Sequence, residues 1–429
     1  MMRCQQESET DMLEKPDQQG ADRPSRCVIL IVCDYALSYM GGAQTALRQQ
    51  ARAFHENGHV VWVAAPRASA DRELSAYGVH PLDPPATLWI PGTNFPLVRN
   101  TPLLRRRLRE AMVTSKIDLV ITHSEFGLAA GALMAARSLD LPTLHTVHTF
   151  FWRSPRNTAF LAPWARAAYR LATGLTVGRK QLVPQPLGNT LRNMTLAACE
   201  AADVVVSPSE HQAIMLREAG LPDVRTVSNA SCRGAITPTP PPENGPLRLV
   251  WAARFAPEKR LDVMLDAARL VEKQLGPQAV HIDIAGGTLP TESVPESVTV
   301  HGRVSAQEID NLLRDAHAAV ITSHGFDNQP MIALEAFRNN RPVIVSDRAL
   351  DTEFGIAAIL TDDTTALGLA ATIVRLATDR TLLRSPTAAA ASQAQLATAE
   401  EHTRRILASA AHHDGKQRRH DSVQLGGDG

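Results

Sequence analysis

The sequence predicts an α/β protein made of two Rossmann-like domains that face each other across a cleft. Short apolar runs rich in β-branched residues alternate with amphipathic helical patterns, which is typical of parallel sheets whose strands are joined by helices. Residues 231–246 divide this alternation into two series, because the five prolines from Pro238 to Pro246 continue neither a helix nor a central strand. We therefore expect an N-terminal domain over residues 26–230 and a C-terminal domain over 247–386.

The strands of both domains are predicted from these apolar runs. In the first domain they are residues 27–34, 59–65, 117–122, 142–149 and 203–209, and in the second 247–253, 280–286, 298–302, 318–322 and 341–347. An alanine-rich stretch predicts a terminal helix over residues 387–411. Residues 1–25 and 412–429 are mostly polar, so both segments are expected to be poorly ordered.

The composition excludes several classes of protein. The chain has 429 residues with 44 basic and 44 acidic side chains, so no excess charge favours a nucleic-acid partner. We see neither a signal-peptide pattern nor an apolar run of about 18 residues, and expect a cytoplasmic protein with membrane contact only as peripheral binding at the inner face. A reducing compartment and no metal site are expected, because the cysteines are scattered without a CxxC pair: Cys4, Cys27, Cys33, Cys199 and Cys232.

Two glycine-rich or basic segments that follow strands suit an anionic ligand. Gly41 and Gly42 stand between the first strand and a helix, where backbone N–H groups and the helix dipole favour a phosphate. Arg254 and Lys259 follow the first strand of the second domain, where a guanidinium and an ammonium can hold a diphosphate. Taken alone, a tight turn or a solvated basic loop explains each segment as well.

A third segment is the loop that leads to Pro330. Gly325 permits an unusual turn, and Pro330 suits the first turn of a helix whose N–H groups face the cleft. Asp327 can accept hydrogen bonds from sugar hydroxyls, and Glu335 can accept two from a vicinal diol such as ribose. Taken alone, a helix-capping acid and a surface acid explain these residues as well.

In combination, the segments resemble the retaining glycosyltransferases of family 4, which have the two-domain GT-B fold. The resemblance covers residues 27–385. It is carried, in order, by Gly41-Gly42-Ala43-Gln44, His148-Thr149, Ser207-Pro208-Ser209-Glu210, Asn229, Arg254 with Lys259, Asp327 with Glu335, and Arg341-Pro342-Val343-Ile344. It implies transfer of a hexosyl group from a nucleotide-diphosphate sugar, GDP-mannose or a UDP-hexose, to an acceptor hydroxyl with retention of configuration, without a cofactor or a metal.

The resemblance also implies roles for individual residues. Arg254 and Lys259 would neutralise the leaving diphosphate. His148 would lie at the sugar or acceptor side, and we prefer it to His145, which points to the opposite face of its strand, and to His123. The catalytic set is His148, Arg254, Lys259 and Asp327. The donor-binding set is Gly41, Gly42, Arg254, Lys259, Gly325, Phe326, Asp327 at the sugar, Asn328, and Glu335 at the ribose.

The sequence departs from the family pattern at three positions. Asp327 stands where the family usually has Glu, so its carboxylate reaches one methylene less. Arg260 and Ala230 stand where the family usually has glycine. Because of Asp327, a non-catalytic protein that binds a nucleotide sugar or a glycan is the alternative. A sugar-nucleotide epimerase or a phosphorylase is a further enzyme class on a similar architecture.

The acceptor is expected at the N-terminal domain, which has local positive charge. Residues 102–113 predict a basic amphipathic helix, and residues 141–199 hold seven bases and six aromatics but no acid. Such a mixture suits an anionic lipid surface, and a similar basic helix occurs in phosphatidylinositol mannosyltransferases, which the chain distantly resembles. We expect a lipid or lipid-linked acceptor, with a solvated helix as the alternative. The basic residues of the helix are Arg105, Arg106, Arg107 and Arg109.

Overall fold

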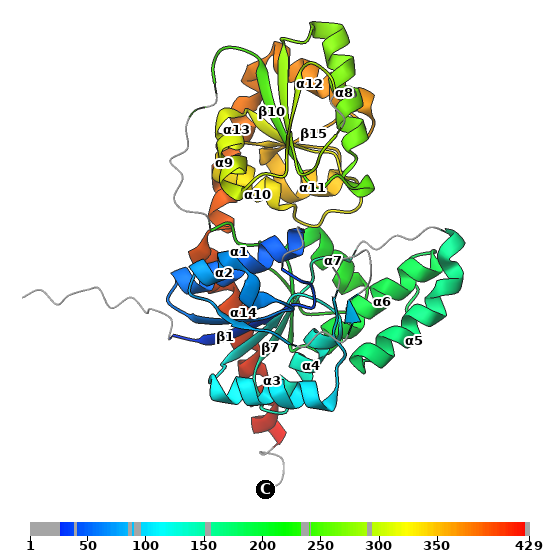
Figure 1. Ribbon diagram of the computed structural model, residues 1–429, viewed down its shortest axis with the longest axis vertical. Coiled ribbons are helices and arrows are strands. Elements are labelled where there is room, and N and C mark those ends of the chain that lie inside the picture. The colour runs from blue at the N-terminus through cyan, green and yellow to red at the C-terminus, as the bar shows by residue number, and fades with distance from the viewer. Residues whose placement is uncertain are drawn as a thin grey trace, which may run out of the picture.

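The computed structural model contains two α/β domains stacked end to end (Figure 1). It describes residues 26–37, 41–84, 88–89, 96–150, 156–232, 240, 242–289 and 294–424. The segment 1–25 with Cys4, residues 233–239 and 241 of the proline-rich segment, and residues 425–429 lie outside the described residues.

The N-terminal domain is built on a seven-stranded parallel sheet with the order β3-β2-β1-β6-β7-β8-β9. Its strands are β1 (Val28–Val32), β2 (Val60–Ala64), β3 (His80–Leu82), β6 (Leu119–Thr122), β7 (Thr143–Thr146), β8 (Val204–Ser207) and β9 (Val224–Thr226), with a separate ribbon of β4 (Leu88–Trp89) and β5 (Pro96–Leu97). Its helices are α1 (Gly42–Glu56), α2 (Arg72–Ala76), α3 (Pro102–Thr114), α4 (Gly127–Arg137), α5 (Ala162–Thr173), α6 (Pro186–Glu200) and α7 (Glu210–Glu218).

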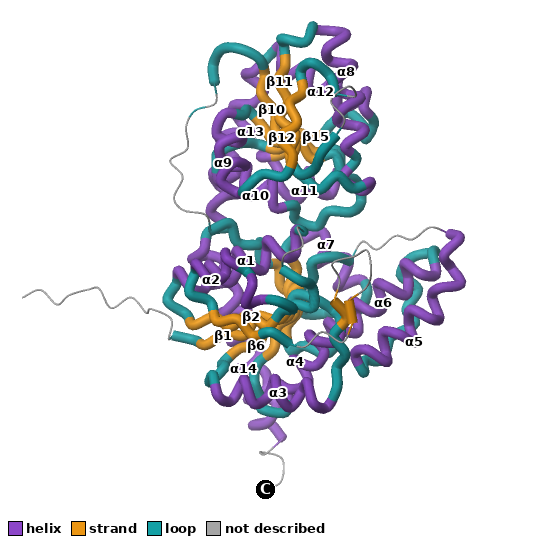
Figure 2. Tube along the Cα trace, viewed as in Figure 1, coloured by secondary structure: helices purple, strands orange, loops and turns teal. Residues whose placement is uncertain are grey.

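The C-terminal domain is built on a six-stranded parallel sheet with the order β12-β11-β10-β13-β14-β15. Its strands are β10 (Leu247–Ala252), β11 (Val280–Ala285), β12 (Val298–Gly302), β13 (Ala318–Ile321), β14 (Val343–Val345) and β15 (Ala358–Leu360). Its helices are α8 (Leu261–Leu275), α9 (Ala306–Asp315), α10 (Met331–Arg338), α11 (Arg348–Phe354), α12 (Ala366–Thr378) and α13 (Arg384–Leu396). Helices cover the sheets of both domains, and these sheets lie at the centre of their domains (Figure 2).

The strand orders explain where a ligand can bind. In the N-terminal sheet the order reverses between β1 and β6, and in the C-terminal sheet between β10 and β13. Open parallel sheets bind ligands in the crevice at such a switch point, outside the carboxyl ends of the strands. Every predicted strand is present, and both predicted Rossmann-like domains are confirmed.

The C-terminal end of the described chain differs from the sequence prediction. Instead of one helix over 387–411 there are two, α13 and α14 (Ala399–Gln424), and the second continues into the segment expected to be poorly ordered. The helix is interrupted before Ala399 because Thr398 caps a new helix: its Oγ1 accepts a hydrogen bond from the backbone N–H of Glu401 at 3.3 Å. Helix α14 returns to the N-terminal domain, where Ile406 is fully buried in the core beneath α1 (Figure 1).

Candidate functional site

A cleft of about 1370 Å³ lies between the two domains. It brings together nearly all of the residues predicted for catalysis and donor binding: Gly41, Gly42, His148, Arg254, Lys259, Phe326, Asp327, Asn328 and Glu335. Gly325 belongs to the same loop as Phe326. The predicted acceptor residues, Arg105, Arg106, Arg107 and Arg109, lie instead on α3, at the end of the N-terminal domain remote from the C-terminal domain (Figure 1).

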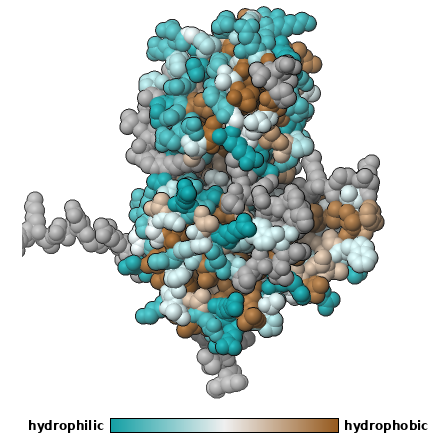
Figure 3. All heavy atoms as spheres, viewed as in Figure 1, coloured by the Kyte–Doolittle hydropathy of each residue, from teal (hydrophilic) through white to brown (hydrophobic). Residues whose placement is uncertain are grey.

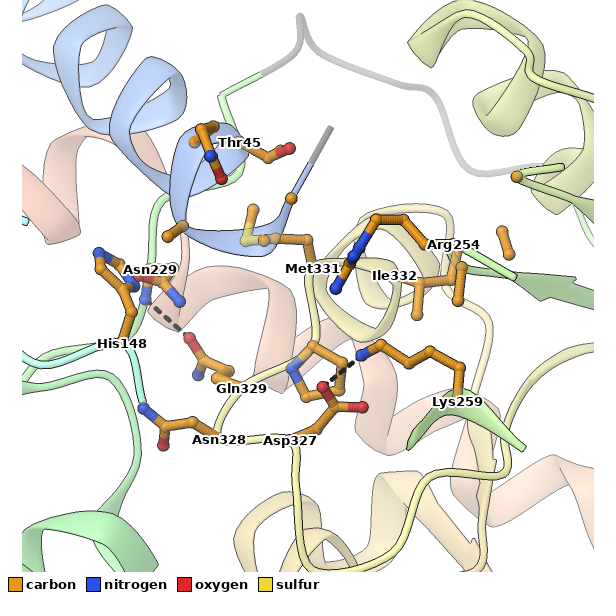
Figure 4. Close-up of a pocket in the computed structure, with 18 of the residues that line it drawn as sticks. Thr45, His148, Asn229, Arg254, Lys259, Asp327, Asn328, Gln329, Met331 and Ile332 are labelled. Carbon is orange, nitrogen blue, oxygen red and sulfur yellow. Dashed lines mark hydrogen bonds and ion pairs between the residues drawn. The ribbon is translucent and has the colours of Figure 1, made fainter. Parts of the chain in front are cut away.

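Two cations of the cleft, Arg254 and Lys259, follow strand β10. Arg254 Nη2 forms an ion pair with Glu258 at 3.2 Å, with about a third of the arginine side chain exposed. Lys259 Nζ contacts Asp327 Oδ1 (Figure 4) and lies 5.3 Å from the centre of the Phe326 ring. The sequence places Lys259 and Asp327 at different parts of a donor, whereas the structure pairs them. Both cations lie at the edge where the switch point exposes strand ends, so this half of the cleft can hold an anion.

The loop between β13 and α10 has a fixed shape. Gly325 adopts the left-handed region at φ 61°, which favours glycine, and its N–H donates to Asp347 Oδ2 at 2.6 Å. Ser323 Oγ donates to Asp327 Oδ2 at 2.5 Å, so both oxygens of this carboxylate are engaged. Pro330 then precedes α10, which carries Glu335 about one turn in.

Arg260 stands where the family pattern has glycine, and it adopts a backbone conformation that favours glycine. Its backbone adopts φ 52°, a left-handed conformation that costs an ordinary residue about 1 kcal/mol. Its guanidinium donates to the carbonyl oxygens of Thr364 at 2.5 Å and Thr322 at 3.3 Å. These hydrogen bonds offset the backbone cost and hold the loop that carries Lys259. Ala230, the other replacement, is fully buried and shows no positive φ.

The glycines opposite the cations begin helix α1. A Cβ added at Gly42 would meet no described atom within 4 Å, and its φ is not positive. Neither packing nor backbone conformation therefore requires glycine at this position. Because Gly42 lines the cleft at a helix N-terminus, the space above it is suited to an anionic ligand.

His148 follows β7 and is bonded to a second histidine. Its Nε2 lies 2.7 Å from Nδ1 of His123, which also lines the cleft. His145, in contrast, is fully buried and contacts Thr122 Oγ1 at 2.7 Å through Nδ1. The preference for His148 over His145 agrees with this placement. The preference for His148 over His123 does not separate the two, because both line the cleft and the sequence could not show that β6 and β7 end side by side.

Burial favours the neutral form of the histidines and of Glu125 in the N-terminal half. It lowers the pKa of His148 to about 4 and of His145 to about 3, and it lowers the pKa of His123 well below its ordinary value. Burial, with a smaller contribution from Asp34, raises the pKa of Glu125, another cleft residue, to about 8. Near pH 7 these side chains carry little charge.

The two domains are connected directly beside the site. Gln329 Oε1 accepts a hydrogen bond from the Asn229 backbone at 2.8 Å (Figure 4), and Gln329 Nε2 donates to Ser228 Oγ at 3.0 Å. Asn328 Nδ2 donates to the Val147 carbonyl oxygen at 3.3 Å. These contacts tie the donor loop to the N-terminal domain next to His148.

Sequence reasoning missed several residues at or beside the cleft. Gly286 follows β11 with φ 126°, and a Cβ there would lie 1.9 Å from the Ala253 carbonyl oxygen. The pair of glycines after an apolar run was the available signal. Gln329 has no such signal, because its partners are distant in the sequence. Among the described residues, no group of three or more His, Cys, Asp or Glu side chains could hold a metal ion.

Comparison with known proteins identifies both domains. Residues 40–230 match the model of Glycosyltransferase Family 4, and residues 246–379 match the model of Glycosyl transferases group 1. The chain is a two-domain glycosyltransferase. No curated protein sequence matches it significantly.

Solved structures show the same GT-B fold for this glycosyltransferase. Anabaena HepE in complex with UDP and glucose is 15% identical, with a TM-score of 0.60 over 89% of this chain and 99% of that one. A glycosyltransferase from Rickettsia africae is 14% identical, with a TM-score of 0.62 over 91% and 99%. TarM of S. aureus is 16% identical, with a TM-score of 0.51 over 72% and 58%. The expected GT-B fold is thereby confirmed.

Proposed function

We propose that this glycosyltransferase moves a hexosyl group from a nucleotide-diphosphate sugar, GDP-mannose or a UDP-hexose, to a hydroxyl of a lipid, lipid-linked or glycan acceptor with retention of configuration. One observation carries the proposal: Arg254 and Lys259 share a cleft with the N-terminus of α1 at Gly42 and with the carboxylates Asp327 and Glu335. Cations and backbone N–H groups stabilise the charge of a departing diphosphate, and carboxylates bind sugar hydroxyls. The UDP in the HepE structure supports a uridine donor.

Arg254 and Lys259 also lead us to propose that the transfer needs no metal. They supply two positive charges at the sheet edge where the diphosphate would lie. Addition of EDTA should therefore leave kcat unchanged.

Thermal unfolding in the presence of nucleotides tests the donor proposal. GDP, UDP, ADP and their sugar conjugates are compared on wild type and on Arg254→Ala, Lys259→Ala. A ligand at about 100 times its Kd stabilises the protein by about 2.7 kcal/mol. A shift with one nucleotide that the double variant loses supports the proposal, whereas no shift with any of them contradicts it. Proton NMR of the product then tests retention, which an inverted anomeric centre contradicts.

The contact between Lys259 and Asp327 favours one alternative, binding without transfer, because the pair neutralises a cation that the leaving group needs. Asp327→Glu separates the two functions. Gain of turnover in this variant would indicate a degenerate site that only binds the nucleotide sugar. Loss of turnover would show that the site is adapted to the shorter aspartate.

We further propose that the acceptor is reached at an anionic membrane surface. Three large apolar side chains are 69–74% exposed at α5 and at the short 3-10 helix that precedes it (Arg156–Leu161): Phe160 in the 3-10 helix, and Trp164 and Leu171 in α5. The spacing of seven residues places Trp164 and Leu171 on one face of α5. Brown apolar atoms gather on this projecting part of the N-terminal domain in Figure 3. We call these three residues the α5 stripe.

Basic residues lie beside the α5 stripe. The groove between α5 and α6 is lined by Arg166, Arg170 and Arg179, and no acid occurs between residues 141 and 199. Apolar side chains next to cations are what an anionic membrane interface binds. No helix among the described residues is both long and apolar enough to cross a bilayer.

Helix α3 is a weaker candidate than its sequence predicts. Arg106 pairs with Glu110 at 2.8 Å, and Arg105 donates to Asn100 Oδ1 at 3.1 Å. Both guanidinium groups are thus engaged within the protein. Arg107 and Arg109 are exposed and remain the residues of α3 that can contact lipid headgroups.

Co-sedimentation with phosphatidylserine vesicles and with phosphatidylcholine vesicles tests the membrane proposal. Trp164→Ser with Leu171→Ser should abolish binding to the anionic vesicles, and Arg107→Glu with Arg109→Glu should weaken it. Ile214→Ser, which removes an exposed apolar side chain from α7, is the matched control. Equal binding of wild type and the α5 variant would overturn the membrane proposal without affecting the donor proposal.

A further inference from the structure

An uninterrupted chain of hydrogen bonds connects helix α14 with the cleft. The Ser228 carbonyl oxygen lies 2.7 Å from His402 Nδ1, and His402 Nε2 lies 2.9 Å from Gln50 Nε2. Gln50 Oε1 lies 2.7 Å from His123 Nε2, and His123 Nδ1 lies 2.7 Å from His148 Nε2. We call these five groups the histidine relay.

The partners fix every proton of the histidine relay. A carbonyl oxygen only accepts, so His402 Nδ1 carries the proton and, in a neutral ring, Nε2 accepts. The Gln50 amide must then donate to His402 and accept from His123 Nε2, which leaves His123 Nδ1 as an acceptor. His148 Nε2 therefore donates, and Nδ1 of His148 is left without a proton.

Burial keeps the three imidazoles in this neutral form. Gln50, His123 and His402 are each no more than 3% exposed. Desolvation lowers the pKa of His402 and of His148 to about 4 and the pKa of His123 well below its usual value.

The geometry of the last step supports a directional bond. The ring centres of His123 and His148 are 4.8 Å apart, close to the largest separation that a 2.7 Å nitrogen contact allows. The hydrogen bond therefore runs along the line joining the two rings rather than across stacked faces.

We propose that the Ser228 carbonyl, acting through His402, Gln50 and His123, holds His148 as the Nε2–H tautomer and makes its Nδ1 a hydrogen-bond acceptor for a hydroxyl group in the cleft. His402 and Gln50 are thus positioning residues, although His402 belongs to the helix that follows the C-terminal domain. The inference rests on the proposed function for the identity of that hydroxyl, which would belong to the transferred sugar or the acceptor. The tautomer itself is independent of it.

Ser228 gives the relay a second connection. Its carbonyl ends the relay, while its Oγ accepts the hydrogen bond from Gln329 of the donor loop. Ser228, whose carbonyl sets the tautomer of His148, is therefore also bonded to the C-terminal domain, which carries Arg254 and Lys259.

Two variants on helix α1 test the proposal. Gln50→Met keeps the side-chain length but removes both hydrogen bonds of the relay. Gln49→Met is the control: Gln49 is equally buried, and its Oε1 accepts a hydrogen bond from the Cys232 backbone at 2.8 Å outside the relay. Nitrogen-15 NMR of the imidazoles identifies the protonated nitrogen in each ring, and kcat and KM are measured on the same samples.

The expected results are specific to the relay. In wild type and Gln49→Met, the proton of His148 is on Nε2. In Gln50→Met both tautomers are populated, and kcat falls about tenfold, the effect usual for a partner that orients a functional histidine. Gln50→Glu keeps an acceptor for His123 Nε2–H, so it should restore the tautomer of His148 and most of kcat.

Two results would overturn the inference: a His148 proton on Nδ1 in wild type, or an unchanged tautomer in Gln50→Met. If no nucleotide sugar is turned over, the proposed function fails, yet the NMR measurement on the unliganded protein still decides the relay.

Discussion

The two halves of the cleft offer a ligand different kinds of interaction. The C-terminal half is charged, with Arg254 and Lys259 beside the carboxylates of Asp327 and Glu335. In the N-terminal half the buried groups are neutral near pH 7, because burial lowers the pKa of His148 and raises the pKa of Glu125, while Arg48 is ion-paired with Asp71 at 2.7 Å. Charges attract over a distance and are screened by salt, whereas neutral hydrogen bonds depend on geometry. The C-terminal half therefore attracts an anionic ligand, and the buried neutral groups of the N-terminal half orient it.

The largest effect is expected when the positive charge is removed from the C-terminal half of the cleft. Arg254→Ala with Lys259→Ala should lower kcat/KM by about a thousandfold or more, because each cation stabilises the charge of the leaving group. The salt dependence of kcat/KM should disappear with it. Arg269→Ala on α8, a cation that pairs with Asp266 outside the cleft, is the control and should leave both unchanged.

The buried neutral histidines, which include His402 of the relay, can be probed through pH. Because the folded pKa of His402 is about 4, below the ordinary 6.5, the stability it contributes is present above pH 6.5 and is lost as the pH falls toward 4. The loss amounts to about 3 kcal/mol for this residue. Urea unfolding of wild type and His402→Gln between pH 4 and 8 should show a flatter profile for the variant. The same change at the exposed His55 should leave the profile as it is.

A substitution at Gly42 tests whether the N-terminus of α1 holds the donor phosphate. Gly42→Asp has room for its side chain and places a negative charge at a helix N-terminus, so the melting temperature should stay equal or rise slightly. The carboxylate would repel a donor phosphate, and KM for the donor should rise about ten- to a hundredfold. Gly42→Ala is the control, because it adds a side chain at this position without adding a charge. A destabilised aspartate variant would mean that glycine is needed for the fold.

The smallest effect is expected at Arg260. Its side chain holds the loop that carries Lys259, at a position where the family pattern has glycine. Arg260→Ala keeps the left-handed backbone and loses the hydrogen bonds to Thr322 and Thr364, so it should be less stable than Arg260→Gly by about 1 kcal/mol. Urea unfolding measures the difference. Equal stability of the two variants would show that the backbone conformation carries no cost.

Local patterns predicted the parts of the molecule that local interactions determine. The central strands were evident from their apolar runs, and Arg254, Lys259 and Asp327 from their places after strands. The edge strands β3 and β15 escaped detection because three residues each, partly exposed, form no distinctive pattern. The pairing of Gln50 with His402 was equally hidden, since the two residues are 352 positions apart and meet only when α14 packs against α1.

The return of α14 to the N-terminal domain sets an order of events during synthesis. The N-terminal domain leaves the ribosome first, but Ile406, which fills its core beneath α1, is made only after the whole C-terminal domain. Until then the N-terminal domain exposes an apolar surface and lacks His402 of the histidine relay. Completion of the first domain therefore coincides with completion of the second, and the nascent chain acquires both halves of its cleft together.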